Sequence, residues 1–348
     1  MLTFYNEHHA QHRGRHEMFR GEQVPCFEKP ERADMVLAEF ERRGLGKVVT
    51  PHGVSLVSLE RIHTPRYLHF LRSAWSEWIA LDPANAARDA FPSVWPIRGM
   101  RADIEPDNFS ARMGLYSMDS GTPLTAGTWT AAKTGADCAV NAAHALRLGE
   151  RASFALTRPP GHHAGADYFG GYCFLNNAAL AGQHLLDDGA ERVAILDIDY
   201  HHGNGTQDIF YKRADVLFVS IHADPRSEYP FYLGHADETG AGDGVGYNMN
   251  VPLPHGASAA QWFAALETAC FKLQGFAPDA LVVSLGVDTF AGDPLSKFAL
   301  ASADFLRVGE RIGYLGLPTA FVFEGGYAVA EIGINVVNVL EGFETAAV

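Results

Sequence analysis

The chain has few of the features that mark secreted or membrane proteins. Its four cysteines, Cys26, Cys138, Cys173 and Cys270, lie far apart and form no Cys-x-x-Cys pair, so a disulfide framework is excluded. No stretch approaches the roughly 18 consecutive apolar residues of a transmembrane helix. The polar first 16 residues also lack the apolar centre of a secretory signal. We therefore expect a protein of the reducing cytoplasm that does not bind membranes.

Positive charge is also scarce. The 348 residues include 27 Lys and Arg against 41 Asp and Glu, a formal net charge of −14. Nucleic-acid binding needs a surplus of Lys and Arg, so no nucleic-acid partner is expected. The charge permits a cationic substrate but does not show one, and an ordinary acidic surface is the simpler interpretation. Apolar residues at 47% and charged residues at 20% exclude a disordered or fibrous chain.

Short apolar runs alternate with longer segments of helical periodicity. The later runs are continuously apolar, which is typical of strands buried on both faces of a parallel sheet. The predicted strands are Leu2–Tyr5, Ser153–Thr157, Arg192–Ile198, Val216–Ile221, Leu281–Gly286 and Thr319–Glu324. The predicted helices are Thr128–Leu148, Asn177–Asp188, Ala259–Gly275 and Ala303–Leu315. This alternation predicts a three-layer α/β/α sandwich that binds ligands beyond the carboxyl ends of its strands.

Residues 81–122 break this alternation, because they are rich in proline, glycine, asparagine and charged residues. A loop this long inside a compact fold is usually functional or an assembly element, with a flexible surface insertion as the alternative. No clear linker divides the chain. We therefore expect one domain over residues 1–348, with an insertion for the entrance or for oligomerisation at about 81–122.

Polar residues follow several predicted strands and suggest a metal site. In an extended chain Asp197, Asp199 and His201 project to the same side, so Asp199 and His201 can bind one ion. A parallel sheet would bring Asp288 alongside them as the third ligand. One histidine and two carboxylates with an open position suit catalytic Zn(II) or Fe(II). The alternative is that these strand-end residues only cap helices.

The pair His162-His163 follows another predicted strand. One of the two could act as a general base toward a water molecule at the metal. Each needs a hydrogen-bond partner on its second ring nitrogen, and Asp197 and Asn204 are available. Tyr327 follows two glycines, and its hydroxyl could donate to a developing oxyanion. A tyrosine that merely packs is the alternative.

Two further patterns do not indicate catalysis. The N-terminal histidines have no acidic or cysteine companions, so we expect them to be solvated; they are His8, His9, His12 and His16. The glycine-rich stretch 240–246 follows no predicted strand and opens no helix. We interpret it as a loop and not as a dinucleotide-binding turn.

These motifs resemble the histone deacetylase-like amidohydrolases of the arginase–deacetylase superfamily over nearly the whole chain. The segments that carry the resemblance are 158–164, 170–177, 197–207, 219–222, 250–252, 285–294 and 324–327. The segments most similar to the bacterial acetylpolyamine amidohydrolases of this family are 169–177, 201–211, 224–234, 286–294 and the 81–122 insertion. The resemblance implies the arginase–deacetylase fold, with a mostly parallel sheet of about eight strands.

The resemblance implies a zinc-dependent enzyme that hydrolyses N-acetyl amides. The positions that match the zinc ligands are Asp199, His201 and Asp288, with Fe(II) as the alternative metal. The family also implies structural potassium. The residues that match an inner potassium site are Asp197, Asp199, His201, Ser220 and Ile221. Those that match a second, weaker site are Phe210, Arg213, Val216 and Tyr247.

The remaining catalytic roles also come from the resemblance. His163 would take a proton from the attacking water and return it to the leaving amine, while His162 would act electrostatically. Asp197 would orient His162, and Asn204 would pair with His163. Many class I deacetylases have Asp where Asn204 stands, which should make His163 less basic here. Tyr327 matches the tyrosine that polarises the acetyl carbonyl.

The substrate follows from tunnel positions and from the insertion. By similarity, the positions that line the tunnel are Gly171, Tyr172, Tyr229 and Leu295. This slot fits the methylene chains of acetyl-lysine and acetylputrescine equally well. In polyamine deacetylases the insertion helps to form a dimer and narrows the entrance. We therefore expect acetylated polyamines or short diamines (acetylputrescine, acetylcadaverine) as substrates of a homodimer, with a tetramer left open. A protein or peptide acetyl-lysine deacetylase is the alternative.

Acidic residues could meet the free amines of such a substrate. Glu17 matches a position implicated in polyamine recognition, and Glu105, Asp107 and Asp119 are further candidates against the alternative of solvated loop positions. A glutamate near the polyamine tail in one relative is Gly121 here, which favours short diamines.

Two rival functions are less well supported. An arginase-like ureohydrolase needs a second Asp-x-Asp pair where this chain has Asp288-Thr-Phe. A catalytically inactive binding module would have lost a ligand or Tyr327.

Overall fold

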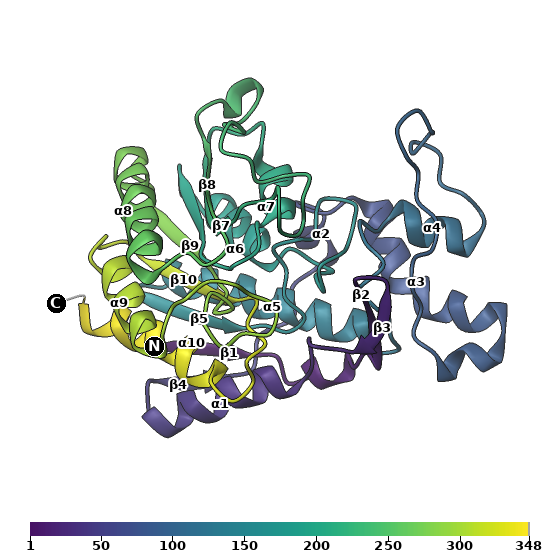
Figure 1. Ribbon diagram of the computed structural model, residues 1–348, viewed down its shortest axis with the longest axis horizontal. Coiled ribbons are helices and arrows are strands. Elements are labelled where there is room, and N and C mark those ends of the chain that lie inside the picture. Colours follow the sequence, from purple (N-terminus) through teal and green to yellow (C-terminus); the bar gives the residue numbers. More distant parts are fainter. Residues whose placement is uncertain (347–348) are drawn as a thin grey trace.

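The computed structural model describes residues 1–346, in which helices cover both faces of a central sheet of eight strands (Figure 1). In spatial order the strands are β4 (Lys47–Val49), β1 (Leu2–Tyr5), β5 (Ala152–Leu156), β10 (Thr319–Phe323), β9 (Ala280–Leu285), β6 (Val193–Asp197), β7 (Val216–Ala223) and β8 (Asn248–Leu253). Every neighbouring pair in this sheet is parallel. The predicted three-layer fold is confirmed, with a sheet that is parallel throughout rather than mostly parallel.

The two faces of the sheet are buried under two separate helical layers. Side chains alternate along each strand, so Phe154 and Leu156 of β5 face one layer and Ala155 faces the other. The first layer is formed by α1 (Glu31–Arg43), α8 (Ala259–Phe276), α9 (Ser302–Gly313) and α10 (Ile332–Ala346). The second includes α2 (Leu56–Leu59), α3 (Pro65–Leu81), α5 (Thr128–Arg147) and α6 (Asn177–Asp187). Burial on both sides explains why the central strands are continuously apolar.

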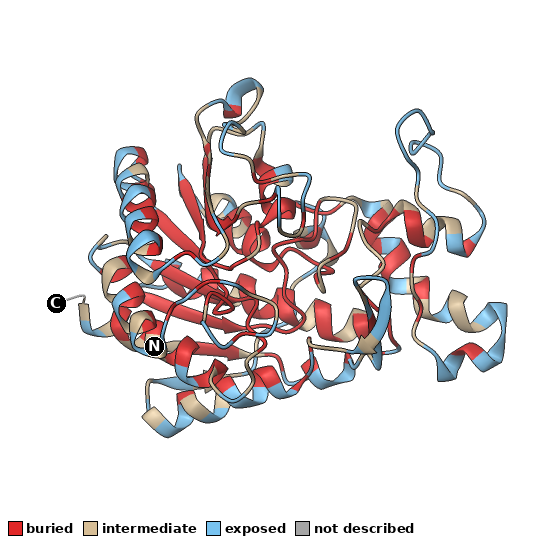
Figure 2. Ribbon diagram, in the orientation of Figure 1, coloured by how far each residue is buried: buried red, intermediate tan, exposed pale blue. Residues whose placement is uncertain are grey.

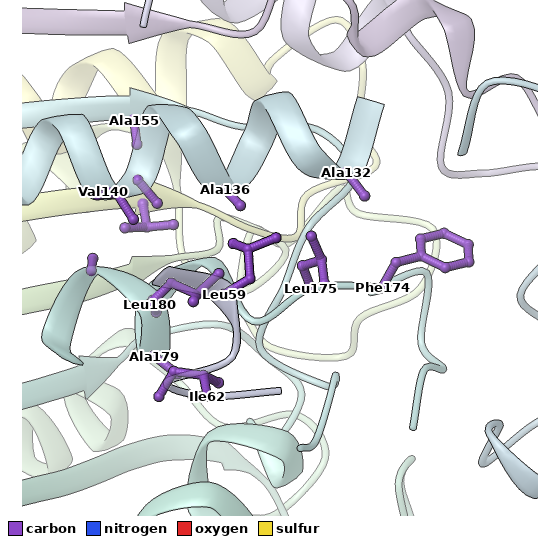
Figure 3. Close-up of a cluster of buried hydrophobic side chains, with 14 of the residues drawn as sticks. Leu59, Ile62, Ala132, Ala136, Val140, Ala155, Phe174, Leu175, Ala179 and Leu180 are labelled. Carbon is purple, nitrogen blue, oxygen red and sulfur yellow. The ribbon is translucent and has the colours of Figure 1, made fainter. Parts of the chain in front are cut away.

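The second layer packs through small residues. Ala132, Ala136 and Val140 lie along one side of α5 and belong to the same buried cluster as Leu175 and Leu180 (Figure 3). Small side chains on α5 allow its backbone to lie close to its neighbours, and the leucines fill the remaining space. In Figure 2 the sheet is almost wholly buried, while the outer faces of the helices are exposed. This packing holds the strand ends in fixed relative positions.

The predicted strands and helices are all present, with ends within two residues of those expected. The sequence analysis missed three long helices, α1, α3 and α10, and several short or polar elements. Strand β8 contains Asn248, Asn250 and Pro252, residue types that are rare in strands, and it is tolerated because β8 lies at the sheet edge. A two-stranded antiparallel hairpin of β2 (His16–Phe19) and β3 (Glu22–Pro25) was also missed. The loop 240–246 contains only a short 3-10 turn, Gly242–Gly244.

The 81–122 insertion projects from the body of the molecule at the right of Figure 1. It contains a short 3-10 helix, η2 (Pro83–Ala87), and α4 (Phe109–Leu115), and much of the rest is exposed loop (Figure 2). No helix within residues 1–346 combines the length and the hydropathy needed to cross a bilayer. The predicted domain runs to residue 348, and its last two residues, Ala347 and Val348, lie outside the described part.

Candidate active site

A cavity of about 740 Å³ is lined by side chains that follow the carboxyl ends of the central strands. Its lining includes His163, His201 and Tyr327, each from a different strand end. Other parts of its wall come from the β2–β3 hairpin and from the end of the insertion. Parallel strands end at one edge of a sheet, so residues distant in sequence meet there.

The predicted metal ligands lie together beside this cavity. Asp199 and Asp288 are fully buried, and the His201 side chain is 12% exposed. His201 Nδ1 lies 3.1 Å from Asp288 Oδ2 and 3.4 Å from Asp199 Oδ1. These positions follow from the sheet, because β6 and β9 are neighbours with Asp197 in register with Ser284. The loops after both strands therefore begin side by side.

The three groups fit a divalent cation. Burial and the nearby Asp199 carboxylate raise the pKa of Asp288 to about 7, so the negative charge of Asp288 is poorly stabilised by the protein alone. Their remaining oxygens are already oriented: Gly325 N donates to Asp199 Oδ2 at 2.8 Å, and Tyr200 N donates to Asp288 Oδ1 at 2.8 Å. One imidazole and two carboxylates suit Zn(II) or Fe(II). A dication would neutralise the pair of carboxylates.

The adjacent histidines have different partners. His162 Nδ1 donates to Asp197 Oδ2 at 2.9 Å, and Asp197 is fully buried. Burial opposes a charge on His162, but Asp199 and Asp197 outweigh it and raise the pKa of His162 to about 10. His163 is a cavity residue whose pKa is lowered well below its usual value by burial and by the neighbouring His162 and His201. His162 is therefore the charged imidazole, and His163 the neutral one.

Asn204 determines which nitrogen of His163 carries the proton. Its Oδ1 lies 2.6 Å from His163 Nδ1. Its Nδ2 has other acceptors, Met118 Sδ at 3.3 Å and the Tyr168 hydroxyl at 3.4 Å, which assigns the oxygen to the side of His163. His163 therefore donates from Nδ1 and keeps a lone pair on Nε2, as a general base requires.

Gly171 is required by the close approach to His163. Its backbone has φ +53°, and a Cβ at this position would lie 2.2 Å from His163 Cδ2. Only glycine allows both the left-handed conformation and the contact. The predicted tunnel residue Gly171 therefore also sets the position of the imidazole.

Tyr327 lies in the cavity wall and is 8% exposed. Its backbone N–H donates to Asp293 Oδ2 at 2.6 Å. The Arg32 guanidinium lies 4.8 Å from the centre of the ring and donates from Nε to Gly326 O at 2.5 Å. Burial raises the pKa of the Tyr327 hydroxyl, so the phenol stays protonated and can donate.

Three residues that hold the Tyr327 loop in place were not predicted from the sequence: Arg32, Glu28 and Asp293. Arg32 is fully buried in α1 and pairs with Glu28 at 2.8 Å, while Glu28 also accepts from Arg158 Nε at 2.8 Å. Asp293 holds the backbone of the Tyr327 loop. The signal that could have found Arg32 is a lone charge within the apolar stripe of α1, next to Ala33 and Val36.

The predicted substrate positions divide into two groups. Gly171, Tyr172, Tyr229 and Leu295 line the cavity, and so do Glu17 and Asp119. The Tyr172 hydroxyl donates to Glu17 Oε1 at 2.8 Å, and the Tyr229 hydroxyl donates to Asp119 Oδ2 at 2.7 Å. Burial raises the pKa of Glu17 to about 7, against the lowering effect of the Tyr172 hydrogen bond.

Glu105 and Asp107 are exposed and are not part of the cavity wall. Glu105 instead accepts from the Tyr116 hydroxyl at 2.7 Å. The structure thus brings two of the four candidate acids to the cavity and leaves the other two on the surface of the insertion.

The N-terminal histidines are not all solvated as predicted. His9 and His12 are 2% and 3% exposed, so the prediction is wrong for these two. Their backbone oxygens accept from Arg158 Nη1 at 2.5 and 2.7 Å. They are buried because this segment packs on Arg158 below the active site, whereas His8 and His16 remain accessible.

The residues predicted for potassium lie around β7. Asp197 of β6 is in register with Ser220 of β7, and Ile221 follows Ser220 in that strand. The second group surrounds the start of β7, where Arg213 N donates to Phe210 O at 2.9 Å at the end of α7 (Asn204–Phe210). Val216 opens β7, and Tyr247 O accepts from Phe218 N at 3.0 Å.

Comparison with known proteins agrees with the geometry. The histone deacetylase domain model matches residues 26–343. Acetylpolyamine amidohydrolases 2 and 1 of Pseudomonas aeruginosa are 57% and 54% identical, each over at least 99% of both chains. The acetylpolyamine amidohydrolase of Mycoplana ramosa is 44% identical over 98% of this chain and 99% of its own. The crystal structure of the acetylpolyamine aminohydrolase from Burkholderia pseudomallei superposes with a TM-score of 0.94 at 41% identity, covering 99% of each chain.

These matches confirm the family resemblance that the sequence motifs indicated. The superposed crystal structure confirms the predicted fold. The chain belongs to the histone deacetylase family and is an amidohydrolase.

Proposed function

We propose that this enzyme deacetylates small acetylated polyamines, above all short diamines such as acetylputrescine and acetylcadaverine, to the free amine and acetate. The observation that carries the proposal is a cavity with His163 and Tyr327 beside the metal-ligand group and with the carboxylates Glu17 and Asp119 in its wall. The full-length similarity to acetylpolyamine amidohydrolases supports the same substrate class. We further propose that the chain acts as one catalytic domain.

We propose Zn(II) as the metal, held by Asp199, His201 and Asp288, with Fe(II) as the alternative. When bound there, the ion supplies a Lewis acid next to the acetyl carbonyl. We also propose structural potassium ions at the two groups of residues around β7. Removing divalent metal with a chelator should abolish hydrolysis, and Zn(II) should restore it.

The side chains then divide the proton transfers among themselves. His163 accepts a proton from the attacking water at Nε2, and Asn204 keeps its Nδ1 protonated. The same proton passes to the leaving amine. His162 is held by Asp197 and carries positive charge close to the developing oxyanion. The Tyr327 hydroxyl donates to the carbonyl oxygen as it gains charge.

The aromatic walls suit a thin methylene chain. Tyr229 stands at 87° to the His163 ring with centroids 5.1 Å apart, and the Tyr172 and Tyr327 rings are 5.7 Å apart. Glu17 accepts a hydrogen bond from the Tyr172 hydroxyl, and Asp119 accepts one from the Tyr229 hydroxyl, so both rings are held in place. Asp119, and Glu17 in its ionised form, add negative charge to the wall, which favours a substrate with a free ammonium group.

A peptide acetyl-lysine deacetylase is the alternative, because the acetyl-lysine side chain has the same methylene chain. The test compares kcat/KM for N-acetylputrescine, N8-acetylspermidine and an acetyl-lysine peptide. We expect the acetylated diamine to be preferred over the other two. A clear preference for the peptide would overturn the proposed substrate class, although not the deacetylase chemistry.

We propose a homodimer that forms through the insertion. Within residues 94–104 of the insertion, four apolar side chains are more than half exposed: Val94, Ile97, Met100 and Ile104. Exposed apolar side chains grouped on one projecting segment are typical of a protein contact. Light scattering of the wild type should report a dimer, with a tetramer as the other outcome, and Ile97→Asp with Met100→Asp should release monomers. We also propose a cytoplasmic location, on the sequence argument above.

A further inference from the structure

A second group of metal-binding side chains lies outside the active site, where the C-terminal ends of α5 and α6 meet. His144 is in the last turn of α5, and His184 is in the last turn of α6. Asp188 follows α6 directly, four residues after His184, which places the two on the same face. None of the three lines the cavity of about 740 Å³. The group is therefore separate from the catalytic residues.

The candidate ligand atoms form a nearly equilateral triangle. His144 Nδ1 lies 3.2 Å from Asp188 Oδ2, His184 Nε2 lies 3.3 Å from the same oxygen, and the two nitrogens are 3.5 Å apart. Tetrahedral zinc with bonds of about 2.0–2.1 Å separates its ligand atoms by about 3.3–3.4 Å. The triangle thus has the dimensions of one face of a tetrahedral zinc site.

The electrostatic surroundings favour a cation at this point. Two helices end here, and each adds the partial negative charge of its C-terminus. Each of the two imidazoles can offer a nitrogen lone pair to a metal ion.

We propose that His144, His184 and Asp188 form a second transition-metal site that binds Zn(II) and whose ion links the ends of α5 and α6. Two imidazoles with one carboxylate favour Zn(II) over Mg(II) or Ca(II), which prefer oxygen ligands. The side chains are 51%, 25% and 30% exposed, so the site is open to ions from solution and leaves a position for water.

The test counts zinc on the full-length protein. After dialysis against graded concentrations of buffered free Zn(II), we expect two zinc ions per wild-type chain at saturation. His144→Gln and Asp188→Asn should each bind one. His69→Ala is the matched control, because His69 is an exposed histidine on α3 outside the metal-binding groups of residues 1–346, and it should still bind two. His201→Ala, which removes an active-site ligand, should keep one ion, and its combination with His144→Gln should keep none.

Thermal unfolding supplies a second measurement. Zinc beyond the first equivalent should raise the Tm of the wild type and of His69→Ala but not of His144→Gln, since an ion that binds only the folded chain stabilises it. One zinc ion per wild-type chain at all concentrations would overturn the proposal. So would a second ion that persists in both His144→Gln and Asp188→Asn. The three side chains would then be an ordinary hydrogen-bonded cluster. His201→Ala monitors the active-site ion separately, so the two proposals fail independently.

Discussion

The role of Tyr327 can be tested by removing a single oxygen atom. The Tyr327 hydroxyl forms no hydrogen bond with any group in residues 1–346, although its ring packs against Arg32 and its backbone is held by Asp293. Tyr327→Phe keeps the ring, the packing and the backbone contacts. It leaves no protein group without a partner, so the free energy of unfolding should change little.

The expected effect is confined to the transition state. Loss of one oxyanion donor typically costs about 10²–10³-fold in kcat, equivalent to about 2.7–4 kcal/mol. The substrate carbonyl carries little charge before attack, so we expect kcat to fall by this factor while KM changes much less. His163 and Asn204 are untouched and should continue to position the water.

The assay is steady-state hydrolysis of N-acetylputrescine by wild type and Tyr327→Phe, with zinc content and Tm measured on the same preparations. Zinc content and Tm should match those of the wild type. Activity within about threefold of the wild type would refute the donor role. A loss of activity accompanied by loss of zinc would instead mean that Tyr327 supports the site structurally.

Three further changes probe the support of the site. Gly171→Ala places a Cβ 2.2 Å from His163 Cδ2, so kcat/KM should fall by about 10²-fold through displacement of the imidazole, as measured by steady-state kinetics; an unchanged value would contradict the positional role. Arg32→Met leaves the buried Glu28 with one cationic partner fewer, and urea unfolding should report a loss of about 3 kcal/mol. The raised pKa of Glu17, about 7 against about 4.5 when unfolded, means that the folded chain binds its proton more tightly. As the pH rises from 4.5 to 7, the free energy of unfolding of the wild type should therefore fall by up to about 3 kcal/mol relative to that of Glu17→Gln. If urea unfolding gives the two proteins parallel plots of this free energy against pH, the pKa shift is refuted.

The strands of the sheet could be predicted where both of their faces are buried, because such strands consist mainly of apolar residues. Strands β6 and β9 are continuously apolar and end shortly before Asp199 and Asp288, so a local pattern indicated both the strand and the ligand after it. Strand β8 could not be found in this way, because it has a free edge, where polar residues and proline cost little.

The supporting residues could not be predicted for a different reason. Arg32 reaches the Tyr327 loop from a segment almost 300 residues away, and Asp293 holds the same loop from 34 residues away. No local spacing in the sequence records such contacts. The prediction that His9 and His12 are solvated was wrong for the same reason. Their polarity indicated solvent, but Arg158 needed their backbone oxygens as buried acceptors.

The adjacent histidines show how partners, and not position, assign chemical roles. Both rings are buried and lie 4.1 Å apart, so two positive charges there would repel each other strongly. Asp197 is a carboxylate and stabilises the charge on His162, whereas Asn204 is neutral and only fixes the orientation of His163. The charged His162 then lowers the pKa of His163 further. A carboxylate at position 204 would weaken this division, because it would stabilise a proton on the ring that has to accept one from water. The single asparagine therefore helps to keep one histidine a base and the other a cation.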